Sequence, residues 1–201
     1  RDLPSFGFNA PPKTMHRFWM MLCHYHGQLF NASEIATSLM VSDKTVKKYL
    51  DILAGTFMIR SLQPWFENIK KRQVKTPKIY FRDTGIFNAL SSIRSITELT
   101  KTPKIGPLWE GFSLEAVINC LQIRADDCYF WSTHNEAELD LFVFKNGKRL
   151  GFECKYTDTP KITKSMNIAF EDLKLDHLYV IFPGNQHFPL SEKITACGLS
   201  A

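Results

Sequence analysis

Apolar side chains recur at helical spacing in three segments of the first 55 residues and so predict three helices. The first covers about residues 12–25, with prolines at its start and Gly27 after its end. The second begins near Ser33, which we expect to cap it. The third covers about residues 44–55. A short helix, a tight turn and a further helix form the helix-turn-helix signature.

The third predicted helix has two chemically different faces. We expect Ser42 or Asp43 to cap it. One face is apolar and suits a core, while the other is basic and suits contact with phosphates. The apolar positions are Val46, Leu50 and Leu53, and the basic positions are Lys44, Lys47 and Lys48. Lysine binds phosphate as a point charge, so we expect contact with the DNA backbone rather than readout of base sequence.

After Gly55 the pattern changes to strands. Residues 56–66 and 77–83 predict a hairpin, and a short helix capped by Asp83 or Thr84 follows. A hairpin after a helix-turn-helix is a wing, so residues 1–103 predict a winged helix-turn-helix domain. The basic positions expected at the wing tip are Lys70, Lys71, Arg72 and Lys75. The alternative is a helical module that packs on protein.

The second half predicts an α/β domain over residues 104–201, after a linker at 100–107 that carries two prolines and a glycine. Asn146-Gly147 predicts a tight hairpin turn. The elements follow in the order α-β-β-β-α-β. We expect helices at 108–123 and 161–176, and strands at 127–133, 138–144, 150–156 and 177–184.

Charge is divided unevenly between these halves. The chain of 201 residues has a net charge of +5. Residues 1–103 hold 15 Lys and Arg against 7 Asp and Glu, whereas residues 104–201 hold 10 against 13. The first half therefore suits a polyanion such as duplex DNA.

The cysteine usage, the apolar runs and the first residue give expectations about the cellular compartment, membrane contact and the length of the parent protein. Five cysteines without C-x-x-C spacing favour a reducing cytoplasm over a disulfide framework. No apolar run reaches the roughly 18 residues of a membrane span, so we expect no membrane partner. Because the chain starts with Arg1, we expect a piece of a longer protein.

The hairpin of the second half carries the candidate chemistry. A regular register around Asn146-Gly147 makes Asp140 and Glu153 cross-strand neighbours on one face. Two such carboxylates favour a divalent cation between them, with Lys155 beside it. Glu115, on the preceding helix, is expected to complete the shell. This set suits metal-assisted phosphodiester hydrolysis, and the alternative is an ion network on a half-exposed hairpin.

The stretch AELDLFVFKNGKRLGFECKY resembles the core of the PD-(D/E)XK nuclease-like superfamily. The resemblance implies a restriction-endonuclease-like αβββαβ domain with Asp140, Glu153 and Lys155 as the catalytic set. It implies Glu115 as the helix carboxylate, Mg²⁺ or Mn²⁺ as the cofactor, and Glu138 as a weaker candidate. Leu139 stands before Asp140 in place of the proline in the superfamily's name.

A second resemblance covers nearly the whole chain. RDLPSFGF, SDKTVKKYLDIL, LWEGFSLEAVI and the hairpin together resemble the C-terminal half of prokaryotic AAA-type ATPases. This implies a preceding ATPase half that binds ATP and acts as a partner, and a parent protein that often assembles into oligomers. The chain itself lacks the G-x-x-x-x-G-K-[ST] motif.

Three functions follow as expectations. The first is a Mg²⁺-dependent DNA endonuclease module of the longer ATPase. The second is a non-catalytic DNA-binding or regulatory module, and the third is a protein-interaction module for the ATPase.

Overall fold

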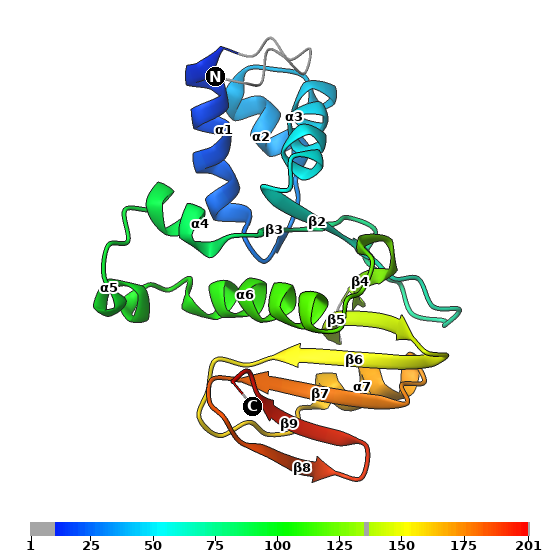
Figure 1. The fold of residues 1–201 in the computed structure, drawn as a ribbon. Helices are drawn as coiled ribbons and strands as arrows, with labels where there is room; N and C mark the ends of the chain where they lie inside the picture. The colour runs from blue at the N-terminus through cyan, green and yellow to red at the C-terminus, as the bar shows by residue number, and fades with distance from the viewer. Residues whose placement is uncertain (1–10, 135–136, 201) are drawn as a thin grey trace.

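The computed structural model describes residues 11–134 and 137–200, which form a mixed α/β fold (Figure 1). Within this part of the chain, seven α-helices accompany one nine-stranded mixed sheet. The RDLPSFGF stretch lies outside the described residues. None of the described helices has the length and apolar character needed to cross a membrane.

Helices and strands follow one another along the chain without a regular alternation. The helices are α1 Pro12–Tyr25, α2 Ala32–Leu39, α3 Asp43–Gly55, α4 Thr84–Leu90, α5 Ile96–Lys101, α6 Ile105–Cys120 and α7 Lys164–Asp172. The strands are β1 Gln28–Leu29, β2 Ile59–Pro64, β3 Lys78–Phe81, β4 Cys128–Ser132, β5 Glu138–Lys145, β6 Lys148–Cys154, β7 His177–Phe182, β8 His187–Ser191 and β9 Ile194–Gly198.

The three N-terminal helices lie where the apolar spacing predicts them, and α1 has the predicted bounds. One predicted cap is wrong. Asn31, not Ser33, caps α2, because its side-chain oxygen accepts a hydrogen bond from the backbone N–H of Glu34. The Ser33 hydroxyl instead donates to Asp43, at the start of α3. Ser42 caps α3, as expected.

The hairpin of the first half is present, but its tip is not free. Strands β2 and β3 pair antiparallel, while the loop between them lies against the second half of the chain. The backbone N–H of Val74 donates to Ser132, and Lys71 lies 2.9 Å from a carboxylate oxygen of Asp172. Since Arg149 also binds Glu67, the loop is held at several points.

A single sheet runs through both halves of the chain. Its strand order is β1-β3-β2-β4-β5-β6-β7-β9-β8, and β2 pairs parallel with β4. This one pairing joins strands of the first half to those of the second, as Figure 1 shows. Side chains of β3 therefore lie within reach of the second half.

The predicted linker at 100–107 is mostly helical. Helix α5 ends at Lys101 and α6 begins at Ile105, so only residues 102–104 lie outside a helix. Helix α6 thus starts three residues earlier than predicted and ends three residues earlier, at Cys120.

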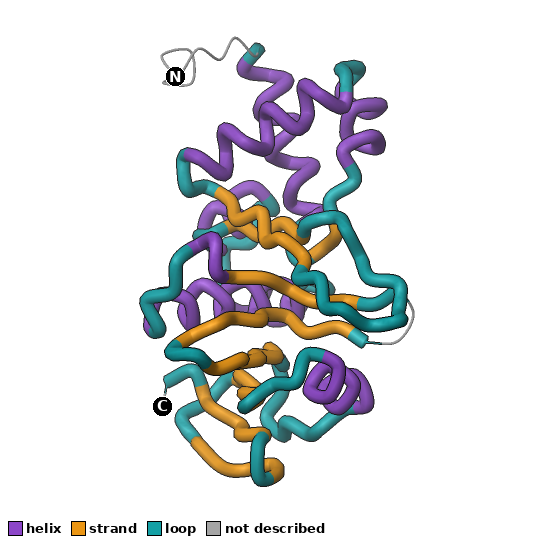
Figure 2. Tube along the Cα trace, turned by 90° about the vertical axis from the view of Figure 1, so that its right-hand side faces the viewer, coloured by secondary structure: helices purple, strands orange, loops and turns teal. Residues whose placement is uncertain are grey.

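Helices α6 and α7 cover opposite faces of the sheet (Figure 2). Leu114 and Ile118 of α6 pack against Leu141 and Phe152, whereas Met166 of α7 belongs to a separate core. The hairpin turns at Asn146-Gly147, where both residues have positive φ, as a tight two-residue turn requires. Strands β8 and β9 extend the sheet beyond the predicted elements.

Candidate metal centre

A β-bulge sets the position of Asp140. Tyr129 pairs with Phe142 and Trp131 pairs with Leu139, so Phe130 alone faces both Asp140 and Leu141. A bulge of this kind re-aims a side chain. The bulge lies between β4 and β5, whereas the β5–β6 hairpin keeps the predicted regular register from Lys145↔Lys148 to Leu141↔Phe152. The next positions along this hairpin are Glu153 and Asp140, a residue that is only 6% exposed.

Three carboxylates meet near this bulge. Glu110 of α6 and Glu138 and Asp140 of β5 each place an oxygen within 4.8 Å of the others. The sequence predicts Asp140, and Glu138 as a weaker candidate, but not Glu110. A usable signal exists: Glu110 lies four residues before Leu114, on the stripe of α6 that faces the core.

An ammonium group lies among these acids. Lys78 Nζ is 3.0 Å from a carboxylate oxygen of Glu110 and also binds Glu138. The hydroxyl of Tyr80, on the same strand, donates to Glu110. Burial alone would lower the pKa of Lys78, but the charges of Glu110 and Glu138 outweigh it and raise that pKa above its ordinary value.

A second ion pair lies at the end of β6. Lys155 Nζ is 2.7 Å from Oε1 of Glu153, a residue that is only 4% exposed. Burial raises the pKa of the Glu153 carboxyl, although Lys155 acts against this. Oε2 of Glu153 is buried without a hydrogen-bond partner among the described residues. A buried carboxylate oxygen of this kind requires an explanation.

Asp140 and Glu153 influence one another electrostatically. Glu153 also feels the charges of Glu110 and Glu138, the two acids that form a cluster with Asp140. Burial and then the charge of Glu153 raise the pKa of Asp140 well above its ordinary value.

The backbone ties these two residues together. The N–H of Cys154, next to Glu153, donates to Oδ2 of Asp140 at 2.7 Å. The structure thus brings Asp140, Glu153 and Lys155 close enough to act on one another electrostatically. Asp140 also belongs to the cluster that it forms with Glu110 and Glu138.

Glu115 lies elsewhere, which corrects its predicted role. Its carboxylate binds Arg60 of β2, with Nη2 of Arg60 at 3.0 Å, and Arg82 at 3.2 Å. Five residues separate Glu115 from Glu110, which places the two on different sides of α6. Glu115 therefore joins α6 to the first half of the chain, and Glu110 is the carboxylate of α6 that lies with Glu138 and Asp140.

The basic residues predicted to contact DNA divide into two groups. Lys44, Lys47 and Lys48 are exposed on α3. In the loop between β2 and β3, Lys70, Arg72 and Lys75 are exposed, whereas Lys71 pairs with Asp172. The α3 group thus forms a basic helix face, and the loop group borders the second half of the chain.

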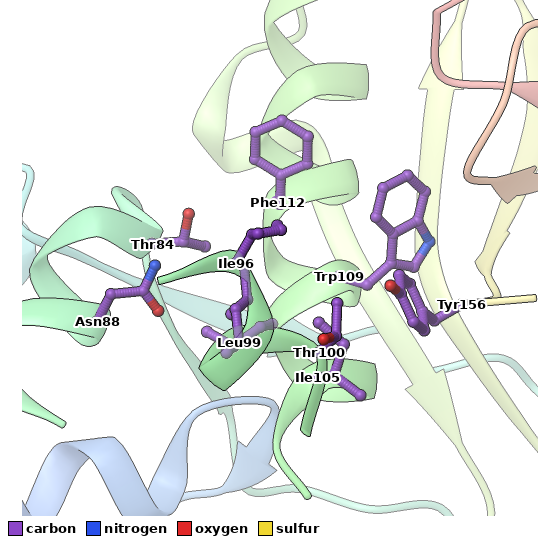
Figure 3. A pocket seen from close by; sticks show the side chains of 10 residues that line it. Thr84, Asn88, Ile96, Leu99, Thr100, Ile105, Trp109, Phe112 and Tyr156 are labelled. Carbon is purple, nitrogen blue, oxygen red and sulfur yellow. The ribbon is translucent and has the colours of Figure 1, made fainter. Parts of the chain in front are cut away.

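A separate apolar hollow of about 280 Å³ lies between α4, α5 and α6 (Figure 3). Trp109 of α6 and Tyr156, the residue after Lys155, line it with ring centroids 6.0 Å apart. The described residues that line it include no acid. Through Tyr156 the hollow therefore lies next to the candidate site along the sequence, but its described lining offers no carboxylate for a metal ion.

Both halves of the chain match domain families. Residues 1–97 match a family described as "Domain of unknown function (DUF8612)", and residues 105–201 match "Domain of unknown function (DUF4143)". DUF4143 is a domain often found in AAA-ATPase-associated proteins.

Two curated relatives are similar over almost the whole chain. They are uncharacterized proteins of Mycobacterium tuberculosis and Mycobacterium bovis, each 46% identical over 196 residues. The match covers 98% of this chain and 44% of each relative, so the chain spans less than half the length of these relatives. No solved structure matches the chain significantly.

Proposed function

We propose that this chain is a DNA-binding module that carries a divalent-metal site for phosphodiester hydrolysis. In this proposal residues 1–103 act as a winged helix-turn-helix, and residues 104–201 act as a restriction-endonuclease-like αβββαβ domain. The longer protein would add an ATPase half, as the resemblance to AAA-type ATPases implies. The proposal places the protein in the cytoplasm with duplex DNA as its partner.

The observation that carries the proposal is the buried, unpartnered oxygen of Glu153 beside three converging acids. Buried charge is costly unless it is paired or bound to a metal. Lys155 satisfies only one oxygen of Glu153, and Asp140 adds further negative charge. An additional cation or a polarised water would satisfy this group.

The residues present fit a hard divalent cation. Four carboxylates face the ammonium groups of Lys78 and Lys155, which leaves two formal negative charges in excess. Carboxylate oxygens are the ligands that Mg²⁺ and Mn²⁺ prefer. Glu110, Glu138 and Asp140 would hold the ion, with Glu153 adjacent. Such an ion would neutralise phosphate charge and lower the pKa of a water molecule.

The chain's own groups have distinct roles in this proposal. Lys155, whose side chain is 41% exposed, is accessible to a phosphate oxygen and would stabilise negative charge there. Glu153 orients Lys155 through their ion pair. The N–H of Cys154 holds the carboxylate of Asp140 in place. The exposed lysines of α3 would bind the DNA backbone.

Cleavage of supercoiled plasmid tests the proposal. The wild-type chain should nick it with Mg²⁺ or Mn²⁺, and Asp140→Asn and Lys155→Met should each lower the rate by about a hundred-fold or more. Glu192→Gln, in the exposed β8–β9 turn, is the matched control and should keep the wild-type rate. Equal rates in Asp140→Asn and wild type would reject the hydrolytic site.

One observation favours the second candidate, a non-catalytic DNA-binding or regulatory module. The ammonium of Lys78 already occupies the acidic cluster, and its side chain is only 4% exposed. In that case the acids and Lys78 would be a buried ion network that joins the two halves. Salt-sensitive DNA binding without any metal binding would support this candidate.

A further inference from the structure

The strand β3 belongs to the first half of the chain, yet it places a cation at the centre of the second half's acids. Lys78 Nζ lies 3.0 Å from Oε1 of Glu110 and binds Oε1 of Glu138. It also acts electrostatically on Asp140, the third acid. Two of the three acids that could share an ion thus already bind this ammonium group, and the third feels its charge.

The distances between the carboxylate oxygens determine whether Lys78 and an ion can bind these acids at the same time. The three carboxylates each place an oxygen within 4.8 Å of the others, a separation that leaves room for one small cation at their common point. Nζ lies at hydrogen-bond distance from two of the three acids. An ion that touches all three would therefore compete with Nζ for the carboxylates of Glu110 and Glu138.

The surroundings hold Lys78 in this position. Its side chain is 4% exposed, and the ammonium lies 5.6 Å from the centroid of the Phe130 ring. Phe130 is the residue that faces the bulge at Asp140. Tyr80, two residues along β3, donates to the same oxygen of Glu110 that Lys78 binds. A displaced Lys78 would thus disturb a contact between the two halves.

We propose that Lys78 is a tethered cation that competes with the divalent ion for Glu110, Glu138 and Asp140, so that the first half of the chain limits metal binding in the second. This inference rests on the metal site of the proposed function. A divalent ion brings twice the charge of an ammonium, so it can replace Lys78, but at the cost of moving a buried lysine. Metal affinity is then lower than the acids alone would give.

Direct metal binding tests the inference. Mn²⁺ binding to the 201-residue chain is measured by titration calorimetry and by electron paramagnetic resonance of free Mn²⁺. Lys78→Met, which keeps most of the side-chain volume without the charge, should bind Mn²⁺ about ten-fold more tightly or better. Lys75→Met, an exposed lysine in the loop before β3, is the matched control and should bind as wild type does.

The outcomes separate this inference from the proposed function. Tighter binding by Lys78→Met alone supports the competition. Equal or weaker binding by Lys78→Met, with clear binding by wild type, overturns the competition and leaves the metal site standing. No binding by wild type or by folded Lys78→Met overturns both.

A second measurement covers a Lys78→Met chain that fails to fold. In wild-type protein labelled with ¹⁵N-lysine, the buried ammonium of Lys78 is followed by NMR as Mg²⁺ is added. The competition predicts that this signal moves to the position of solvent-exposed lysines as Mg²⁺ binds. A Lys78 signal that stays unchanged up to saturating Mg²⁺ overturns the inference.

Discussion

The imidazole of His26 lies so close to Gly111 of helix α6 that a Cβ added to Gly111 would stand 2.8 Å from Nε2. The same Cβ would stand 3.1 Å from the ring of Tyr80. His26 follows the last residue of α1, whereas Gly111 belongs to α6, the helix that carries Glu110. The absence of a side chain at Gly111 therefore allows α6 to approach the first half of the chain.

Gly111→Ala should destabilise the protein. The new methyl group would overlap two buried rings, and overpacking of this kind costs about 1–3 kcal/mol. Gly106→Ala, in the same helix, is the matched control because a Cβ there meets nothing within 4 Å. Urea unfolding should show a lower midpoint for Gly111→Ala alone, and equal midpoints would mean that the two rings move aside freely.

Acid should weaken the fold through His26. The N–H of Phe81 donates to Nδ1 at 3.1 Å, so Nε2 carries the proton and donates to the Pro107 carbonyl at 3.1 Å. Burial lowers the pKa of His26 from 6.5 to about 4. Between these pH values the unfolded chain binds a proton that the folded chain does not, so stability rises with pH.

The contribution of His26 is fully present above pH 6.5 and is lost as the pH falls towards 4. The shift corresponds to about 3 kcal/mol. Urea unfolding across this range should show a much shallower pH dependence for His26→Gln than for wild type. His24→Gln removes an exposed histidine from the last turn of α1, two positions before His26, and should keep the wild-type dependence.

The sequence predicts correctly those elements whose ends are set by neighbouring residues, such as a proline at a helix start or a turn dipeptide. The first helix has the predicted bounds because prolines start it, and the 138–156 hairpin forms because Asn146-Gly147 favours a tight turn. Strand β8 was missed because it is a short edge strand interrupted by Pro189.

Non-local packing produced what the sequence could not predict. Lys78 reaches the acids of the second half because β2 pairs with β4, a contact between residues more than 60 positions apart. The choice of Glu110 over Glu115 depends on how α6 rotates against the arginines of the first half. Neither relationship leaves a signature at short range in the chain.

Substitutions on α6 should separate these two glutamates by function. Glu110→Gln removes an acid from the cluster and should weaken Mn²⁺ binding by about ten-fold or more. Glu115→Gln should leave Mn²⁺ binding unchanged but lower the free energy of unfolding by about 3–5 kcal/mol, because it leaves the buried Arg60 without its charged partner.

Calorimetric Mn²⁺ titration and urea unfolding of both variants check this prediction. The two substitutions make the same chemical change on one helix, so each serves as the control of the other. Weaker Mn²⁺ binding by Glu115→Gln, with Glu110→Gln unaffected, would restore the ligand set expected from the sequence.

DNA binding should depend on the exposed face of α3. Each phosphate contact that is lost should lower the slope of log affinity against log salt by roughly 0.9 on duplex DNA. We therefore expect Lys47→Ala combined with Lys48→Ala to lower the slope by roughly two. Fluorescence anisotropy with a labelled duplex, measured at several salt concentrations, gives this slope.

Lys71 should behave differently, although it lies in the basic loop that the sequence assigns to DNA contact. Its ammonium lies 2.9 Å from Asp172, so its charge is already engaged with the second half of the chain. Lys71→Ala should therefore change the salt slope little, and Lys193→Ala, on the exposed β8–β9 turn, should not change it. A loss in Lys71→Ala as large as that of a single α3 lysine would mean that DNA draws Lys71 away from Asp172 and that the loop releases from the second half on binding.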